Sequence, residues 1–383
     1  MRKRGRYEAP KPKKKGKKVL VIILCVLLLL LGGIGVAGVI IYNDFINRVE
    51  HVVEVENTGP LSDEILAMMG TEPPTEATEP GPTVAVTEEA TVPAATEIIT
   101  EPTEPKIPDI LNVLLIGQSY REKEENYLSD TLILVTINKD SKEVTLTSFP
   151  RDTYVDLPNY KHHTCGWNLI NTNYALGYSF GGTAAAMTMI NNCLKLNFGI
   201  EVDYDIEISL DAFPEIIDAL GGVRMELSQA EADYINDLGY EWVQEVTEGE
   251  NRLFGEAALE YARMRKAEGD SDSDIVRTER QRKLLTALFG KVATKSLKDL
   301  RDIAYQILPM IKTNMTNEQI TECLFEVLPL LKDMTISSGT CPVEGTAWPE
   351  DRDLPDAGVR SVMVFSSEQQ KRLMMPITEG YAP

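Results

Sequence analysis

The sequence predicts an α/β fold in which a mixed central sheet carries helices on both faces, a three-layer sandwich. Short apolar runs with strand character alternate with longer amphipathic runs from residue 109 onward. The apolar content of 43% suits a folded core, and one uncharged run near the N-terminus is long enough to span a membrane. We therefore expect the sandwich to be preceded by a transmembrane helix and a disordered linker.

The first segments of the chain differ sharply in charge. Residues 1–18 hold ten Lys and Arg against Glu8, which gives +9 in a chain of net charge −21, so the remainder sums to −30. Residues 19–41 carry no charge, and at about 1.5 Å per residue they span a hydrocarbon core of roughly 30 Å. The basic flank predicts a cytoplasmic tail, one membrane span and an extracytoplasmic bulk. A cleaved signal peptide is the alternative, although its apolar core would be shorter, about 7–15 residues.

The acidic bulk and the next segment carry further expectations. Nucleic acid is not expected as a partner, because neutralising phosphates needs a basic surface. Residues 42–108 are expected to form a stem followed by a linker, since the sequence from Thr71 is dominated by Thr, Pro, Glu and Ala. Such a composition lacks the apolar content to fold and predicts an extended spacer.

The folded region is expected to begin near Ile110. Strands are predicted where short runs are apolar or alternate, at residues 112–117, 131–138, 143–148, 203–209, 223–227 and 359–365. The second and third of these strands are joined by a turn-like KDSK and should form a hairpin. Helices are predicted from longer periodic runs and glycine stops, at residues 181–196, 210–222, 255–262, 275–294, 300–311 and 318–331.

Four cysteines lie outside the predicted span, where an oxidising compartment permits disulfides. We expect the pairs Cys165–Cys193 and Cys323–Cys341, because each closes a short loop. Free thiols are the alternative.

Arginine placement is the most informative feature for function. Arg151 directly follows a predicted strand, and strand ends are where α/β sheets usually bind ligands. Arg263 and Arg265 are two apart, so they share a face only in extended chain. If both serve one site, the helix that begins at Gly255 must end near Ala262.

The next helix adds a compact polar face. Asp274, Arg277 and Gln281 are spaced i, i+3 and i+7, within about 60° of arc in the first two turns. Several guanidiniums that converge there predict a multivalent anion such as a pyrophosphate, because arginine binds phosphate bidentately. A set of solvated arginines is the alternative; Glu279 and Lys283, for example, can pair at i,i+4.

Two carboxylates stand beside these arginines. Asp130 lies just before a strand, and Asp152 follows Arg151. Either can hold a divalent cation against a pyrophosphate or accept a proton from an incoming hydroxyl, and a capping or turn role is the alternative.

Taken in order, the motifs resemble the LytR-CpsA-Psr family of cell-wall enzymes over about residues 110–293. The matching strings are NVLLIG, SDT, the hairpin that ends in PRDT, NTNYALGYSFGG, DAFPEIIDALGGV, LFGEAALEYARMR and DIVRTERQ. The resemblance implies a catalytic domain at residues 109–294, with residues 295–383 as an extension that completes it or packs on it. It also implies a Gram-positive-type envelope.

The resemblance further implies an activity. Members of the family transfer a phosphate-linked glycopolymer, such as a teichoic acid, a capsule or another wall polysaccharide, from a polyprenyl-pyrophosphate carrier to a peptidoglycan hydroxyl. The carrier lipid would need an apolar tunnel, for which the helix from Phe213 to Leu220 is a candidate. A carrier-lipid-binding or wall-organising protein without catalysis is the alternative, and a transcriptional regulator fits poorly because the cytoplasmic tail is too short to fold.

The resemblance implies roles for individual residues. It implies catalysis by Asp130, Arg151 and Asp274, pyrophosphate binding by Arg121, Arg151, Arg263, Arg265, Arg277 and Gln281, and Mg²⁺ binding by Asp130. Ser119 stands where the family usually has an acidic residue that helps to hold magnesium. This departure leaves Asp130 as the main protein ligand and weakens the expected metal site.

Overall fold

The computed structural model describes residues 48–52, 69, 109–119, 127–241, 243–265, 267, 274–293, 299, 302–303, 306–326, 334–354 and 357–380. The predicted tail and membrane span, and nearly all of the predicted linker, lie outside these residues. Within the described part, no helix combines the length and the apolar character needed to cross a bilayer.

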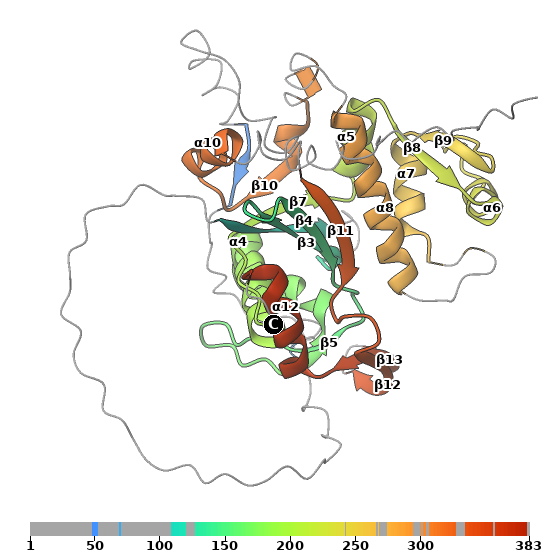
Figure 1. Ribbon diagram of the computed structural model, residues 1–383. Coiled ribbons are helices and arrows are strands. Elements are labelled where there is room, and N and C mark those ends of the chain that lie inside the picture. The colour runs from blue at the N-terminus through green and yellow to red at the C-terminus, as the bar shows by residue number, and fades with distance from the viewer. Residues whose placement is uncertain are drawn as a thin grey trace, which may run out of the picture.

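A large mixed sheet forms the centre of the described chain, as the sequence predicts (Figure 1). Its seven described strands follow the order β1 (Glu50–His51), β10 (Ile311–Thr313), β7 (Tyr204–Ser209), β2 (Ile110–Gln118), β3 (Ser129–Asn138), β4 (Glu143–Ser148) and β11 (Thr335–Thr340). The expected hairpin of β3 and β4 is confirmed and is antiparallel, while β7 pairs parallel to β2. The parallel pairing brings the carboxyl ends of β2 and β7 to one edge, where α/β sheets bind ligands.

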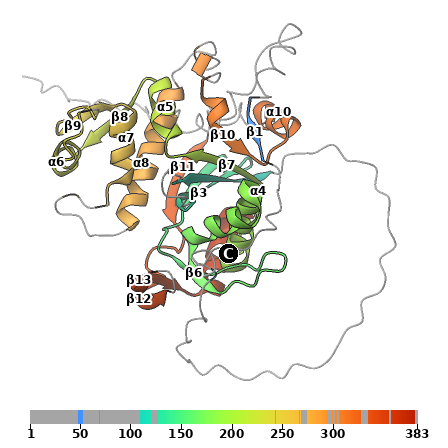
Figure 2. The same ribbon diagram turned by 180° about the vertical axis from the view of Figure 1, so that it is seen from behind.

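Helices cover both faces of this sheet, because alternate residues of each strand point to opposite sides (Figures 1 and 2). Val113 and Val135 pack into a core with the helices α5 (Ala212–Ala219), α7 (Gly255–Arg263) and α8 (Asp274–Ala293). Leu114 and Leu134 pack into a second core on the other face, with α4 (Ile170–Phe198) and α12 (Ser367–Thr378). The two apolar cores and the sheet between them make three layers.

Helix α4 begins earlier than the predicted helix at residues 181–196 and consists of two halves. Gly181 and Gly182 interrupt it with non-helical angles, and the φ of +70° at Gly182 is one that glycine adopts without strain. The halves pack closely, since the Asn173 side chain donates to the Met189 carbonyl at 2.9 Å. The polar residues Asn171, Thr172 and Asn173 of the first half are buried, which the sequence pattern did not indicate.

Close packing within α4 leaves no room for a side chain at Gly177. A Cβ atom there would lie 2.5 Å from the Ala186 Cα and 2.8 Å from the Ala185 carbonyl oxygen. We expect Gly177→Ala to lower the free energy of unfolding by about 1–3 kcal/mol, because backbone has to move. Urea denaturation measures this as a lower midpoint at unchanged slope. Gly339→Ala is the matched control, since its Cβ would meet nothing within 4 Å; equal midpoints for the two variants would contradict the prediction.

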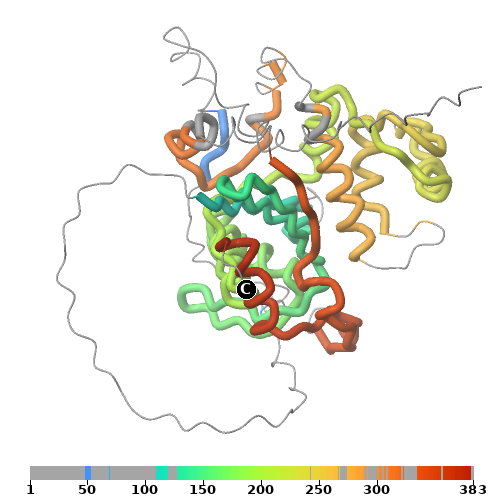
Figure 3. The backbone as a smooth tube through the Cα atoms, viewed as in Figure 1, coloured from blue at the N-terminus to red at the C-terminus, as the bar shows by residue number. Residues whose placement is uncertain are grey.

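The C-terminal part of the chain supplies two strands to the central sheet and covers one face with α12 (Figure 3). The predicted helix at 300–311 is wrong at its end, because Ile311 begins strand β10. The predicted helix at 318–331 corresponds to α10 (Asn317–Glu326).

The predicted last strand corresponds to β13 (Gly358–Phe365), but it does not complete the central sheet. It pairs with β12 (Ala347–Leu354) in a separate hairpin. The strand at this edge of the central sheet, beside β4, is β11, and the two strands pair in parallel. Its sequence, TISSGT, is polar because an edge strand is half solvated, so no apolar pattern reveals it.

Smaller elements complete the described chain. They are the strand pair β5 (Tyr154–Asp156) and β6 (Trp167–Leu169), the pair β8 (Val223–Leu227) and β9 (Gly249–Leu253), helix α6 (Gln229–Asp237) and the 3₁₀ turn η1 (Leu308–Met310). The predicted strand at 223–227 is thus confirmed, but it lies outside the central sheet.

The predicted disulfides Cys165–Cys193 and Cys323–Cys341 are both wrong, because Cys165, Cys193 and Cys341 are free thiols. Cys193 is fully buried on α4, where the Asn197 side chain donates to its Sγ at 3.6 Å. Burial raises the pKa of Cys193 to about 12 and that of Cys165 to about 11. These thiols therefore act as small packing groups rather than as bridge partners.

Candidate active site

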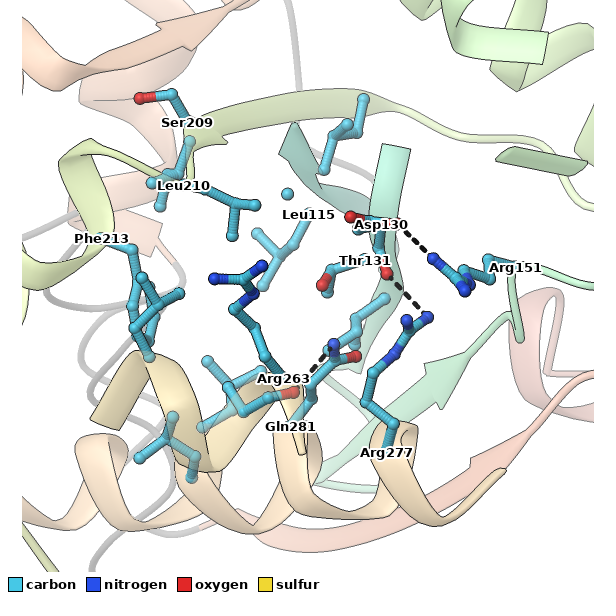
Figure 4. A pocket seen from close by; sticks show the side chains of 18 of the residues that line it. Leu115, Asp130, Thr131, Arg151, Ser209, Leu210, Phe213, Arg263, Arg277 and Gln281 are labelled. Atoms are coloured by element: carbon cyan, nitrogen blue, oxygen red, sulfur yellow. Dashed lines mark hydrogen bonds and ion pairs between the residues drawn. The ribbon is translucent and has the colours of Figure 1, made fainter. Parts of the chain in front are cut away.

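A pocket of about 290 Å³ lies on the face of the sheet that α5, α7 and α8 cover (Figure 4). One end is polar and is lined by six residues from the strand ends, from the end of α7 and the segment after it, and from α8: Asp130, Arg151, Arg263, Arg265, Arg277 and Gln281. The other end is apolar and is lined by side chains such as Leu115, Ile206, Phe213, Leu284 and Leu288. The structure therefore brings together the predicted site residues that it describes, and Arg121 lies outside the described residues.

Arg151 connects the strand edge to the start of α8. Its Nη1 donates to Asp130 Oδ1 at 3.0 Å, and its backbone N–H donates to Asp274 Oδ2 at 2.8 Å. Its Nε also lies 3.6 Å from Asp274 Oδ1. Because Asp274 is the first residue of α8, this contact fixes the helix N-terminus against the end of the sheet.

Arg277 is the most deeply placed cation of the group, with 5% of its side chain exposed. Its Nη2 lies 2.6 Å from Asp274 Oδ1 and donates to the Asp130 carbonyl at 3.3 Å. Burial lowers the pKa of the Arg277 guanidinium, and the Asp274 carboxylate opposes this change. Asp274 thus compensates a buried cation, while the Nε of Arg277 has no hydrogen-bond partner within the described chain.

The two arginines of the EYARMR string reach the pocket in the way that their spacing predicts. Helix α7 ends at Arg263, and Met264 has an extended ψ of 120°, so the backbone leaves the helix before Arg265. Arg263 keeps a partner outside the pocket, Glu260 Oε1 at 3.3 Å. Gln281 donates to the Ala262 carbonyl at 3.5 Å, which connects α8 to the end of α7.

The charges of the pocket do not balance. Four guanidiniums line it, whereas Asp130 supplies the single carboxylate among the described residues that line it. Asp152 lies 3.6 Å from the Arg151 Nε but does not line the pocket, and burial raises its pKa. The polar end is therefore suited to a ligand with several negative charges, and the apolar end beside it is suited to a hydrocarbon chain.

More of the residues that line the polar end of the pocket were predictable from the sequence than of those that line the apolar end. Phe213 lines the pocket, as expected of the helix from Phe213 to Leu220, but Ile217 and Leu220 belong to the packed core. Leu284 and Leu288 of α8 were missed. Their spacing of i+3 and i+7 from Gln281 extends the same helix stripe and could have revealed them.

The chain is similar to proteins of one family. A model of the LytR_cpsA_psr family matches residues 83–364. The polyisoprenyl-teichoic acid–peptidoglycan teichoic acid transferase TagU of Bacillus anthracis is 29% identical over 239 residues, 61% of this chain and 69% of TagU.

Solved structures share the fold. TagT of B. subtilis has a TM-score of 0.52 at 23% identity, over 73% of this chain and 95% of TagT. The LytR-CPS2A-psr family protein YwtF (TagT) with bound octaprenyl pyrophosphate lipid has a TM-score of 0.51 at 19% identity, over 73% of this chain and 95% of that one.

Proposed function

The chain belongs to the LytR_cpsA_psr family, and on this premise we propose that it is a transferase that moves a phosphate-linked glycopolymer from a polyprenyl-pyrophosphate carrier to a hydroxyl of peptidoglycan. The similar TagU protein, of which this chain covers 69%, carries that activity in its name. The observation that carries the proposal is the pocket itself, in which four guanidiniums stand at one end of an apolar chamber. A diphosphate joined to a polyprenyl chain has the same two chemical parts.

The chemistry follows from this charge arrangement. The arginines hold the diphosphate, and the acceptor hydroxyl attacks the phosphorus on the sugar side. The new oxygen–phosphorus bond forms as the bond to the bridging oxygen breaks, polyprenyl phosphate leaves with that bond's electron pair, and the hydroxyl proton is released. Phosphoryl transfer is accelerated chiefly by positioning and charge stabilisation, which prearranged guanidiniums provide.

Asp130 and Asp274 have different roles in this proposal. Asp274 is almost completely buried and engages Arg151 and Arg277, so it acts as a positioning residue. Asp130 has 29% of its side chain exposed and lines the pocket, so it can reach the substrate.

Magnesium is part of the proposal, with Asp130 as its protein ligand. Within the described chain, no three His, Cys, Asp or Glu residues gather as a metal site. Ser119 donates its hydroxyl to the Leu128 carbonyl at 2.9 Å. A single carboxylate nevertheless fits Mg²⁺, which is usually held by one or two carboxylates together with substrate phosphates and waters. When bound, the ion would neutralise charge on the phosphate oxygens.

We also propose the layout around the catalytic domain. Residues 1–18 form a cytoplasmic tail, residues 19–41 anchor the chain in the cell membrane, residues 42–108 form a stem and spacer, residues 109–294 form the catalytic domain and residues 295–383 form its extension. The support is the uncharged run behind ten basic residues. Alkaline carbonate extraction of cell membranes tests this layout, and release of the full-length chain into the supernatant would argue against it.

A reconstituted transfer assay tests the activity. The full-length protein is mixed with a lipid-pyrophosphate-linked glycopolymer and peptidoglycan oligomers, and released polyprenyl phosphate is measured. We expect turnover that depends on Mg²⁺ and falls when a chelator is added. Binding of the donor without any turnover would instead favour a non-catalytic carrier-lipid-binding protein.

A further inference from the structure

A second cavity, a groove of about 510 Å³, lies along the edge strand β11. Ile275, Glu279 and Arg282 of α8 form one wall. The α8 residues that line the candidate active site, such as Arg277, lie about 150° away around the helix, at about 100° per residue. Helix α8 therefore contributes opposite sides of its surface to the two cavities.

The two cavities meet at the N-terminus of α8. Pro150 lines the groove, and the next residue, Arg151, lines the pocket. Likewise, Ile275 lines the groove, and the preceding residue, Asp274, accepts a hydrogen bond from the Arg151 backbone N–H at 2.8 Å. One end of the groove thus reaches the polar end of the pocket, where the proposed diphosphate is held.

The wall of the groove carries a guanidinium group with an unsatisfied hydrogen-bond donor. The Arg282 Nη1 is buried and has no hydrogen-bond partner in the part of the chain that the structure describes. Glu279 interacts electrostatically with Arg282, but its carboxylate pairs with the Lys283 Nζ at 2.8 Å. Glu344, the other acidic residue that lines the groove, is exposed. A buried donor without an acceptor costs about 1–3 kcal/mol, so the guanidinium is poised to gain from a carboxylate in the groove.

The floor of the groove carries hydroxyl groups and has open space. Thr145 lies opposite Ser337 in the register of β4 and β11, and their hydroxyl oxygens are 3.1 Å apart. Two residues further, Thr147 lies opposite Gly339, above which a Cβ would meet nothing within 4 Å. Apolar side chains such as Met374 line the other side. Hydroxyl groups, apolar surface and an unsatisfied guanidinium donor together suit a sugar chain that carries acidic peptides.

We propose that this groove is the acceptor subsite, which binds a peptidoglycan strand with a stem-peptide carboxylate on Arg282. The proposal rests on the proposed transferase function and adds the route of the acceptor. The donor lipid occupies the pocket on one side of α8, so the acceptor hydroxyl approaches the phosphorus from the other side, past Pro150 and Arg151. A protein partner that adds an extended strand to the edge of β11 is the competing occupant.

Two variants test the subsite by different means. Gly339→Trp fills the open floor, and Gly339→Ala is its matched control. Arg282→Gln removes the guanidinium with its unsatisfied donor, and Arg224→Gln is its control, since Arg224 is an exposed arginine that does not line the groove. Circular dichroism and thermal unfolding establish that each variant folds.

Binding is measured separately from turnover, by calorimetry of the full-length protein with soluble peptidoglycan fragments. We expect Gly339→Trp and Arg282→Gln to weaken fragment binding roughly tenfold or more, while both controls bind as the unaltered protein does. The Arg282→Gln effect should vanish with fragments whose stem peptides have been removed by an amidase. In the transfer assay the same variants should raise KM for the acceptor and leave donor binding unchanged.

The outcomes separate this proposal from the proposed function. Undiminished fragment binding by both test variants would overturn the acceptor subsite, even if the protein transfers glycopolymer. Fragment binding that depends on the groove, in a protein without transfer activity, would support the subsite and overturn the transferase function. Fragment binding that is equally strong with and without stem peptides would overturn the role assigned to Arg282.

Discussion

Replacing Arg151 by alanine is expected to lower kcat for glycopolymer transfer by about 100-fold or more. The removal of one prearranged donor to a developing charge typically costs about 10²–10³ in kcat. Arg151 also holds the Asp130 carboxylate through its Nη1 at 3.0 Å, so the variant loses a cation and releases an acid beside the phosphates. Steady-state kinetics with a lipid-pyrophosphate donor measure the change.

The controls for Arg151 distinguish charge from geometry. Arg151→Lys keeps the charge but loses the planar fork, so an intermediate rate is expected. Arg224→Ala removes an arginine whose side chain is 78% exposed and paired with Glu250, and it should leave the rate unchanged. A rate for Arg151→Ala within a fewfold of the unaltered protein would contradict the assigned role.

Replacing Asp274 by alanine is expected to lower the free energy of unfolding by about 3–5 kcal/mol. Arg277 has 5% of its side chain exposed and lies 2.6 Å from the Asp274 carboxylate, so the variant leaves a buried cation without its counter-ion. The Arg151 backbone N–H also loses the acceptor that it has at 2.8 Å. Urea denaturation measures the loss as a lower midpoint.

Two further variants test whether the lost stability comes from the buried charge of Asp274. Asp274→Asn keeps an oxygen acceptor and removes the charge, so a smaller loss is expected. Glu250→Ala breaks the exposed pair with Arg224 and should cost no more than about 1 kcal/mol. A loss below 1 kcal/mol for Asp274→Ala would mean that the buried guanidinium does not depend on this carboxylate.

Local patterns in the sequence account for the parts of the fold that were predicted well. Strands β2, β3 and β4 are apolar, and β3 and β4 are adjacent in the chain, so both their existence and their pairing were predictable. The pairing of β10 with β7 joins segments about a hundred residues apart, and no local pattern encodes it. The edge strand β11 is polar, so the same reasoning missed it.

The candidate site shows the same division. The spacing of Asp274, Arg277 and Gln281 predicted one face of α8, and the structure has Arg277 and Gln281 in the pocket wall, with Asp274 bonded to Arg277. Arg282 lies off that face, and in sequence it looks like any solvated arginine. Only its Nη1, which is buried without a hydrogen-bond partner among the described residues, distinguishes it.

A structure of the full-length protein with a bound polyprenyl pyrophosphate tests the central claim most directly. The account predicts the diphosphate between Arg151, Arg263 and Arg277, with the hydrocarbon chain passing Phe213 and Leu288 between α5 and α8. A diphosphate bound away from these guanidiniums, or a lipid chain outside the apolar chamber, would contradict it.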